Sequence, residues 1–384
     1  MNQRLEFVIL ASQSGLAMKE LCRRFDISCK TGYKWLERYK AGGAEALEEH
    51  SRKPHHSPGQ VSAAMAEAVI ALRLETTWCG RKLHQRLLAL GHAGVPAAST
   101  CTEILRRAGL LKKDSTAGPW ERFERASPNE LWQADHKGCI QTQSGQRCHP
   151  LTMLDDHSRF NVVLDPAGDQ RTASVQAAMT VAFQRYGLPE AILCDNGAPW
   201  GNVAEGIGHT PLTVWLLRLG VRVLHGRPYH PQTQGKEERF HRTLNAELLT
   251  QHTWRDLAHC AEEFPRYRQR YNYERPHDAL GGNTPASTYR PSVRPMPAML
   301  PALEYASMEV RIVRAKGVIT FGNQTWHLGQ AFASLPIGLR PSPQADGQWE
   351  VYFSHFKLGC LDLTTPRCAK HILRPVSAIT PPKD

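Results

Sequence analysis

Three acidic residues lie at the ends of predicted strands or at the start of a predicted helix, positions typical of catalytic side chains: Asp135, Asp195 and Glu238. Asp135 ends the run 131–134, and Asp195 follows shortly after the apolar run 191–193. Glu238 lies near the start of a helical pattern that follows a loop punctuated by Pro and Gly. Carboxylates delivered from three distant segments could converge on metal ions, because hard cations take oxygen ligands. These residue types therefore point to metal-dependent chemistry.

The segments around these acids predict a mixed sheet layered with helices. Period-2 and apolar runs predict strands at 132–140, 148–154, 160–165, 190–194 and 221–224, and 3.6-residue periodicity predicts helices at 171–186, 211–219 and around Glu238. Meandering strands followed by alternating helix and strand are typical of an α/β layer fold. The adjacent acids Asp155 and Asp156 resemble a carboxylate pair, but with Ser158 they are better explained as turn residues.

The first 41 residues predict three short helices, with Ser28 as the N-cap of the third. This is the helix-turn-helix order, in which the last helix presents its early residues to the major groove of DNA. The alternative is a three-helix scaffold with a solvated basic face. On the DNA-binding interpretation, the contacting residues of the third helix are Lys30, Thr31, Lys34 and Arg38.

A second helical module is predicted at 61–113, with Ser99 or Thr100 as a possible cap of its third helix. Its second helix opens with Arg81 and Lys82, which are candidate DNA contacts. Further basic residues fit contact with phosphates, although a solvated charged face explains any one of them equally well: Arg106, Arg107, Lys112 and Lys113. Two tandem modules would bind a longer and more asymmetric DNA site than one.

The net charge of +11 favours polyanionic partners, nucleic acid first. No run approaches the roughly 18 apolar residues that span a membrane, and the start is too polar for a signal peptide. We therefore expect a cytoplasmic protein. The ten cysteines lack the close pairing of zinc ligands, so a zinc knuckle is not expected.

Towards the C-terminus, prolines crowd an extended linker, and short β runs from about 308 predict a small barrel. Pro265 predicts a kink or break in the helix 252–272. The chain is thus expected to be a multidomain α+β protein. Its expected parts are a helix-turn-helix domain at 1–41, a linker at 42–60, the second module at 61–113, a core at 120–290, a Pro-rich linker at 291–307 and a small β-barrel at 308–384.

Several motifs resemble the catalytic core of DDE transposases related to retroviral integrases, in particular the IS481 and IS3 types of bacterial insertion sequences. They are the strings 132–135, 154–159 and 195–197, and above all the long string Pro-Tyr-His-Pro-Gln-Thr-Gln-Gly-Lys at 228–236 followed by 238–244. The long string is specific, whereas Asp-Asn-Gly alone would be weak. The resemblance is strong over about 120–290 and looser over the N-terminal modules.

The resemblance implies an RNase H-like core in which Asp135, Asp195 and Glu238 hold two Mg²⁺ ions, for which Mn²⁺ can substitute. It implies a transposase that binds the ends of its own element as double-stranded DNA, nicks the strands and transfers them, acting as a homodimer or larger assembly on the bacterial nucleoid. The alternative is a DNA-binding regulator whose core has lost catalysis. A nuclease acting on RNA–DNA hybrids is disfavoured by the two helix-turn-helix modules.

Two departures from the family pattern leave questions open. Glu237 stands where the family usually has an apolar residue, so either Glu237 or Glu238 could bind metal; helical periodicity points 237 inward, and the family pattern favours 238. The spacing between Asp195 and Glu238 is long, with 238 − 195 − 1 = 42 intervening residues. The surplus lies at 200–209, which either contacts DNA or a partner or is a tolerated insertion. Lys236 and Arg239 flank the acid and fit phosphate positioning.

Overall fold

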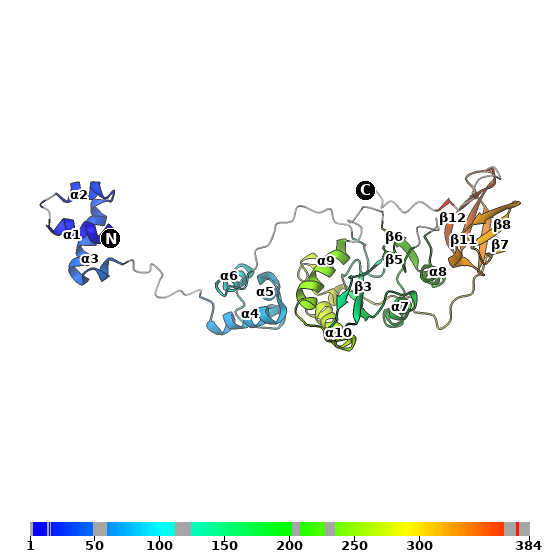
Figure 1. Cartoon of the computed structure of the whole chain (residues 1–384), viewed down its shortest axis with the longest axis horizontal. Helices are drawn as coiled ribbons and strands as arrows, with labels where there is room; N and C mark the ends of the chain where they lie inside the picture. Colours follow the sequence, from blue (N-terminus) through cyan, green and yellow to red (C-terminus); the bar gives the residue numbers. More distant parts are fainter. Residues whose placement is uncertain are drawn as a thin grey trace. The chain divides into compact units, whose positions relative to one another are not determined.

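The computed structural model describes residues 3–13, 15, 17–48, 60–111, 124–201, 208–226, 235–364 and 374–375. The chain divides into two units, Met1–Val61 and Ser62–Asp384. Figure 1 colours both along the sequence. Among the described residues, no helix combines the length and the apolar character needed to cross a bilayer.

The first unit is a three-helix bundle of α1 (Gln3–Gln13), α2 (Met18–Arg24) and α3 (Cys29–Gly42). Its core is built around Phe7, whose ring packs edge-on against Phe25 and Trp35. The predicted cap is confirmed: the Ser28 side chain accepts a hydrogen bond from the Thr31 amide at 3.1 Å. The unit extends past the predicted boundary at 41, because the short helix η1 (Glu45–Leu47) buries Leu47 in this core.

The second module comprises α4 (Ala63–Thr76), α5 (Gly80–Ala89) and α6 (Ala98–Arg107). Leu83 and Leu87 of α5 pack with Cys101 and Leu105 of α6 in one small core. The expected caps Ser99 and Thr100 are wrong, because α6 begins at Ala98 and its N-cap, Ala97, has no side chain that could accept the bond.

The central domain is built on a mixed sheet. Its strands are β1 (Trp132–His136), β2 (Ile140–Gln141), β3 (Arg147–Asp155), β4 (Asn161–Ala167), β5 (Ala191–Cys194) and β6 (Arg222–His225). The order is β2-β3-β1-β5-β6, with β4 paired to the other edge of β3. β1 is antiparallel to β3 but parallel to β5, as expected for a meander that continues into alternating helix and strand.

Helices cover both faces of this sheet (Figure 1). On one face α7 (Thr172–Tyr186) and α8 (Pro211–Arg218) bury Phe183 and Trp215 against Trp132. On the other face lie α9 (Gly235–Leu244), the π-helical turn η4 (Asn245–Leu249) and α10 (Leu257–Tyr273). The predicted break at Pro265 is wrong, because α10 continues through it.

The segment after α10 ties the sheet together. Asn272 accepts a hydrogen bond from the Asn161 amide at 2.8 Å and donates one to the Asn161 carbonyl at 2.9 Å. Beyond η5 (Asp278–Leu280) and α11 (Pro285–Thr288), the Tyr289 ring stacks on Phe160 with centroids 4.2 Å apart. The core domain is therefore complete only when residues beyond 285 are in place.

The C-terminal part forms two antiparallel sheets. The larger has the order β13-β12-β11-β10-β7, and β8 and β9 form a separate pair. The expected small β-barrel is corrected accordingly, because the strand pairings of the described residues leave the larger sheet open, with β7 at one edge. The strands are β7 (Glu309–Ile312), β8 (Val318–Phe321), β9 (Gln324–His327), β10 (Pro336–Pro341), β11 (Gln348–Phe353), β12 (Phe356–Asp362) and β13 (Arg374–Pro375), with η6 (Gln330–Phe332) between β9 and β10.

Candidate active site

Strand pairing places two of the three predicted acids side by side. In the parallel pair β1–β5, Trp132 lies opposite Ile192 and Gln133 opposite Leu193, so partners are 60 positions apart (192 − 132). Asp135 and Asp195 have the same separation (195 − 135 = 60). Continuing the register by two residues therefore puts their carboxylates at one level on neighbouring strands, which run roughly 4.8 Å apart.

The alternation of side chains decides which face these acids occupy. Ala134 and Cys194, the residues just before them, both belong to the core under α7 and α8. Because successive side chains of a strand point to opposite faces, Asp135 and Asp195 point to the face covered by α9. That helix carries Glu237 and Glu238 in its first turn.

The pKa of Asp135 also indicates that Asp195 and Glu238 are its neighbours. Burial is the largest cause that raises its pKa, to about 6, and the carboxylates of Asp195 and Glu238 raise it further. A hydrogen bond from the His136 amide at 2.7 Å opposes this rise. Three acids that repel one another at a strand end are the arrangement that a cation would relieve.

Asp195 is held by its backbone and by the turn that follows it. The His225 ring donates from Nδ1 to the Asp195 carbonyl at 2.9 Å, and the Gly197 amide donates to Asp195 Oδ1 at 3.2 Å. Gly201 closes this turn so tightly that an added Cβ would lie 2.7 Å from the Asn196 carbonyl oxygen. The carboxylate itself remains exposed.

The two adjacent glutamates lie in opposite environments. Glu238 is exposed, whereas Glu237 is completely buried. The predicted inward direction of position 237 is thus confirmed. Burial, with Asp135 as the second cause, holds the pKa of Glu237 well above its usual range. Because Glu238 is exposed and Glu237 is enclosed in the core, the geometry favours Glu238 of the two as a ligand for Mg²⁺.

A buried polar network that the sequence did not indicate joins Glu237 to Asp135. Thr152 Oγ1 donates to Glu237 Oε2 at 3.0 Å and lies 2.8 Å from His241 Nε2. His241 Nδ1 lies 3.9 Å from Asp135 Oδ2. Burial lowers the pKa of His241 to about 4, so the ring is neutral. Two signals could have indicated this network: His241 is four residues from Glu237 on one helical face, and Thr152 pairs with Asp135 across β1 and β3.

The acids Asp155 and Asp156 are structural, as their turn assignment predicted. Both are fully buried. Asp155 accepts bonds from the amides of Asn129 at 2.7 Å and Ser158 at 2.8 Å. Asp156 pairs with Lys236 Nζ at 2.5 Å, so the lysine beside the candidate site has a protein partner.

The other predicted DNA contacts fall into two groups. Lys30, Lys34 and Arg239 are exposed, and Thr31 and Arg38 are half-buried on α3 and available at its surface. Arg81 and Lys82, by contrast, face the core domain: Arg81 lies 3.4 Å from Asp278, and burial followed by repulsion from Arg275 lowers the pKa of Lys82. Contact with DNA stays a prediction for both groups. Most of the 200–209 surplus lies outside the described residues.

The residues present fit a divalent cation in chemistry, though the described part of the chain holds no ready group of three metal-ligating side chains. Asp135, Asp195 and Glu238 offer only oxygen donors, the ligands that Mg²⁺ prefers. Burial first, and the charges of Asp195 and Glu238 after it, raise the pKa of Asp135. A bound cation would oppose both effects by stabilising the ionised carboxylate.

Family models match most of the chain in separate pieces. Two integrase core domain models match residues 125–231 and 219–285. The C-terminal domain of IS481 family transposases matches 308–368. A helix-turn-helix domain matches 3–55, and a homeodomain-like domain matches 31–105.

Curated relatives come from insertion elements and retroviruses. An uncharacterized 31.7 kDa protein of insertion element IS407 from Burkholderia multivorans is 26% identical over 64% of this chain and 86% of its own length. An uncharacterized 39.2 kDa protein of insertion element IS476 from Xanthomonas euvesicatoria is 26% identical over 41% of this chain and 44% of its own. The Gag-Pol polyprotein of baboon endogenous virus is 22% identical over 90% of this chain and 20% of its own.

Among solved structures, the catalytic core domain of HTLV-2 integrase in complex with magnesium is 14% identical, with a TM-score of 0.33 over 43% of this chain and 99% of its own. The simian T-cell lymphotropic virus intasome, solved with a PP2A regulatory subunit, includes a chain that is 13% identical, with a TM-score of 0.39 over 74% of this chain and 91% of its own.

Proposed function

We infer that this chain, which carries an integrase core followed by an IS481 family transposase C-terminal domain, is a DNA transposase that nicks and joins DNA strands at the ends of its element. The observation that carries the proposal is the shared register of Asp135 and Asp195 at the carboxyl ends of two neighbouring inner strands, facing the first turn of the helix that bears Glu238. The two helix-turn-helix matches and the net charge of +11 support duplex DNA as the substrate.

Each acid has a distinct part in this proposal. Asp135 and Asp195 provide ligands from rigid strand ends, and Glu238 provides the third from α9, so that these three residues would hold two Mg²⁺ ions, or Mn²⁺ in their place. When bound, a pair of such ions supplies activation of the attacking oxygen and stabilisation of the leaving oxygen in an in-line displacement. Water as the attacking group gives nicking, and a DNA 3′-hydroxyl gives strand transfer, so one site serves both steps.

Basic side chains near the site orient the substrate in this proposal. Arg239, exposed next to Glu238, is placed to meet a phosphate of the incoming strand. Lys236 supports the site indirectly: its ion pair with Asp156 fixes the start of α9 against the turn after β3. By analogy with related enzymes, which join two DNA ends within one assembly, we propose a homodimer or larger assembly on DNA, and a location with the DNA in the cytoplasm.

A Mg²⁺-dependent nicking assay tests the proposal. Supercoiled plasmid carrying the ends of the element should be nicked by the full chain with Mg²⁺, and Asp195→Asn should lower the rate by about 100-fold or more, because direct ligands matter at least as much as their supporting residues. Glu262→Gln, an exposed acid of α10, is the matched control. If Asp195→Asn nicks as fast as the control, the site assignment is wrong.

One observation favours a second candidate, a DNA-binding regulator without catalysis. The two helix-turn-helix matches would serve such a regulator as well as they serve a transposase. A regulator would bind the element's ends and give no nicking by the full chain at any Mg²⁺ or Mn²⁺ concentration. Binding together with nicking that depends on Asp195 would exclude it.

A further inference from the structure

The basic edge of α5 faces the core domain. Arg81, Lys82, Gln85 and Arg86 follow one another at helical spacing on this edge, while Leu83 and Leu87 are buried in the module's own core. These four residues are called the α5 edge below. Because the module's core does not use them, they are free to serve as a contact surface.

The α5 edge meets an acidic segment that follows α10. Arg86 Nη2 lies 2.6 Å from Glu274 Oε2, and Arg81 Nη1 lies 3.4 Å from Asp278 Oδ1. The segment 274–283, called the acidic arm below, is shaped by its own hydrogen bonds: the His277 amide donates to Asn283 O at 3.0 Å, and the Gly282 amide donates to His277 O at 2.8 Å. The arm therefore presents its carboxylates from a defined loop.

Close packing between the two charged pairs shows that they are parts of one contact. The Gln85 side chain lies against the backbone of Gly282, where an added Cβ would overlap it. Gly282 also has φ +92°, a conformation that favours glycine. Lys82 lies close enough to the buried pair Arg275–Glu247 for both charges to act on it; the Nε–Oε1 distance of that pair is 2.9 Å.

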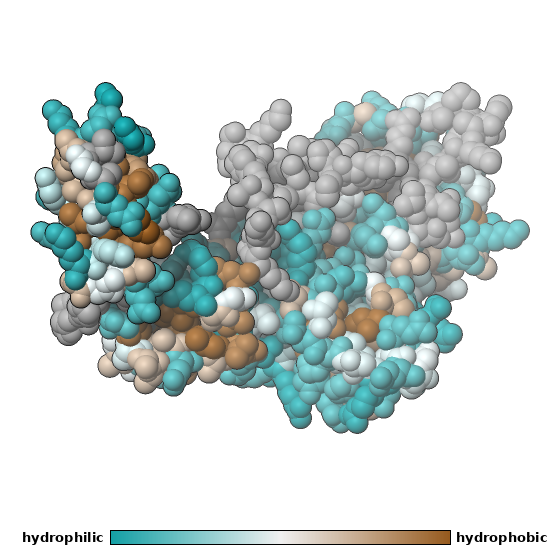
Figure 2. All heavy atoms as spheres, turned by 60° about the vertical axis from the view of Figure 1, so that its left-hand side comes forward, coloured by the Kyte–Doolittle hydropathy of each residue, from teal (hydrophilic) through white to brown (hydrophobic). Residues whose placement is uncertain are grey.

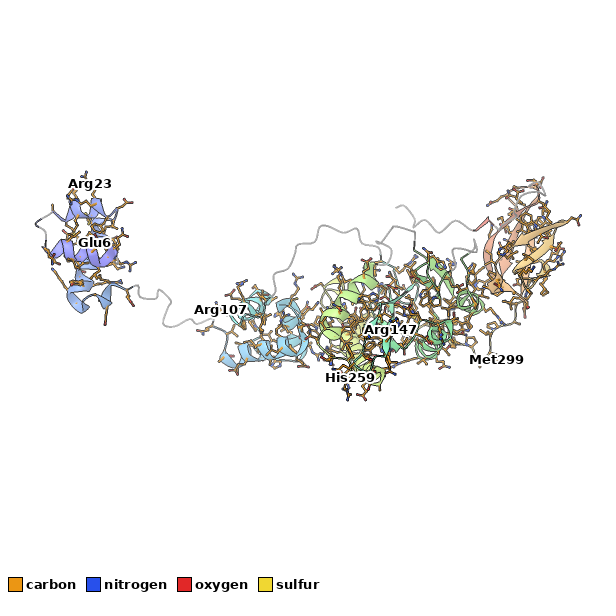
Figure 3. All side chains as sticks on the ribbon, viewed as in Figure 1. Glu6, Arg23, Arg107, Arg147, His259 and Met299 are labelled. Carbon is orange, nitrogen blue, oxygen red and sulfur yellow. The ribbon has the colours of Figure 1, made fainter. Side chains whose placement is uncertain are left out.

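The same basic side chains lie where a helix-turn-helix module meets DNA. In that arrangement the last helix enters the major groove and the helix before it crosses the phosphate backbone. In this module α6 is the last helix and α5 precedes it, with Arg81 and Lys82 in its first turn. The α5 edge can therefore face core carboxylates or DNA phosphates, but not both at once. Among the residues that the structure describes, the ion pairs of Arg106 and Arg107 on α6 are local ones with Glu103, and Arg107 is labelled in Figure 3.

The strength of the contact suits an exchange of partners. The side chains of Arg81 and Asp278 are 67% and 48% exposed, and those of Arg86 and Glu274 are 22% and 42% exposed. Ion pairs this open to water are individually weak. A polyanion gains in addition from the release of its counterions, which the arm cannot offer.

We propose that the α5 edge and the acidic arm form a reversible clasp, which duplex DNA opens by competing for Arg81, Lys82 and Arg86. Without DNA the second module is held on the core by Glu274 and Asp278. With DNA the module exchanges these carboxylates for phosphates and is released from the arm. The inference rests on the DNA-binding part of the proposed function and is independent of catalysis.

DNA affinity tests the clasp without any nicking. The full chain is titrated, in EDTA and about 100 mM salt, into a fluorescent 30-base-pair duplex of arbitrary sequence. Glu274→Gln/Asp278→Asn should bind about 5- to 10-fold more tightly than Glu262→Gln/Asp346→Asn, which removes the same two charges from exposed positions outside the clasp. Equal affinities of the two double variants would overturn the proposal.

Hydrogen exchange of the unaltered chain provides a test that needs no variant. On adding the duplex, the amides of α5 should exchange more slowly and those of 275–283 more rapidly. Slower or unchanged exchange in the arm while the duplex is bound would show a permanent interface and overturn the clasp alone. A chain that does not bind the duplex at all would overturn the clasp together with the proposed function.

Discussion

Asp135 is the residue on which most of the site's electrostatics converge. Its side chain is 29% exposed, and the carboxylates of Asp195 and Glu238 lie close enough to raise its pKa. Its pKa of about 6 lies above the usual 3.8, so the folded chain retains a proton that the unfolded chain has already lost in this range. Folding is therefore penalised increasingly as pH rises from about 4 to 6, and fully above pH 6.

Asp135→Asn should relieve this penalty. In EDTA at pH 7.5 we expect the core domain of this variant to be more stable, by up to about 2–3 kcal/mol, and at pH 4 to match the unaltered chain. Thermal unfolding at both pH values measures the effect. A variant that is less stable at pH 7.5 than the unaltered chain would show that Asp135 is not under repulsion.

The paired variants Glu238→Gln and Glu237→Gln separate the two adjacent acids. Glu238 is exposed, so its change should lower Mg²⁺-dependent nicking by about 100-fold or more with little change in stability. Glu237 is buried, and burial raises its pKa well above the usual range, so the nearly isosteric Gln should keep nicking within about 10-fold. Loss of nicking in Glu237→Gln alone would reverse the assignment of the third ligand.

At the residue scale, the sequence predicts features that depend on neighbouring residues or on a regular spacing along the chain. The separation of 60 between Asp135 and Asp195 is visible in the sequence and proves to be the register of their strands. The inward direction of Glu237 follows from helical periodicity. Thr152 could not be assigned in the same way, because its link to Glu237 and His241 depends on how α9 lies across β3. The pairing of Lys236 with Asp156 could not be predicted for a similar reason, since the two residues are 80 positions apart; contact of Lys236 with DNA stays a prediction.

At the scale of elements, Glu350 of β11 joins neighbouring strands of the C-terminal sheet. It accepts from Lys357 Nζ at 2.6 Å, Arg340 Nε at 2.8 Å and the Tyr352 hydroxyl at 2.9 Å. The hydrogen bond from Lys357 is the largest of the causes that lower the pKa of Glu350 to about 2. Lys357 lies on β12 and Arg340 on β10, so one carboxylate links three strands.

The stability of this sheet should therefore fall in acid. Because the folded pKa is depressed, the contribution of Glu350 is fully present above pH 4.5 and is lost as pH falls towards 2. Because Arg340 is half-exposed and its ion pair is screened by water, we expect Glu350 to contribute about 2 kcal/mol to the free energy of unfolding. Thermal unfolding from pH 5 to 2, followed by tryptophan fluorescence, should show the loss, and Glu350→Gln should flatten it. An equal pH dependence in Glu350→Gln would contradict this role.

Most elements could be predicted from the sequence, because their periodicity is strong. The expected helix 171–186 is α7 at Thr172–Tyr186, and the expected strand 190–194 is β5 at Ala191–Cys194. The misses have physical causes. α10 runs through Pro265 because its flanking turns are packed around Cys260, Phe264 and Tyr267. Whether the C-terminal strands close into a barrel could not be predicted from short β runs. Closure depends on hydrogen bonds between the first and last strands of the sheet, which sequence periodicity does not record.

At the scale of the whole molecule, each described part has its own core. The face seen in Figure 2 carries both hydrophilic and hydrophobic residues. The C-terminal sheet is not independent of the central domain, because Val214 and Leu217 of α8 pack into its core. The second module contacts the central domain through charge instead. The central domain thus has an apolar contact with the C-terminal sheet and a polar contact with the second module, and our proposed clasp assigns the movement to the polar one.

The late closure of the central domain has a consequence for synthesis. The core of the first unit uses residues up to Leu47. The central domain, by contrast, is complete only after Asn272, Tyr289 and Arg294 have been synthesised, because the Arg294 carbonyl accepts a hydrogen bond from the Leu188 amide. A ribosome adding about 5–20 residues per second needs roughly 12–50 s for the residues in between. During that interval the nascent chain exposes a folded helix-turn-helix unit without an assembled active site. On the proposed function, a message cut short in this stretch would therefore encode a competitor of the intact protein for the same DNA.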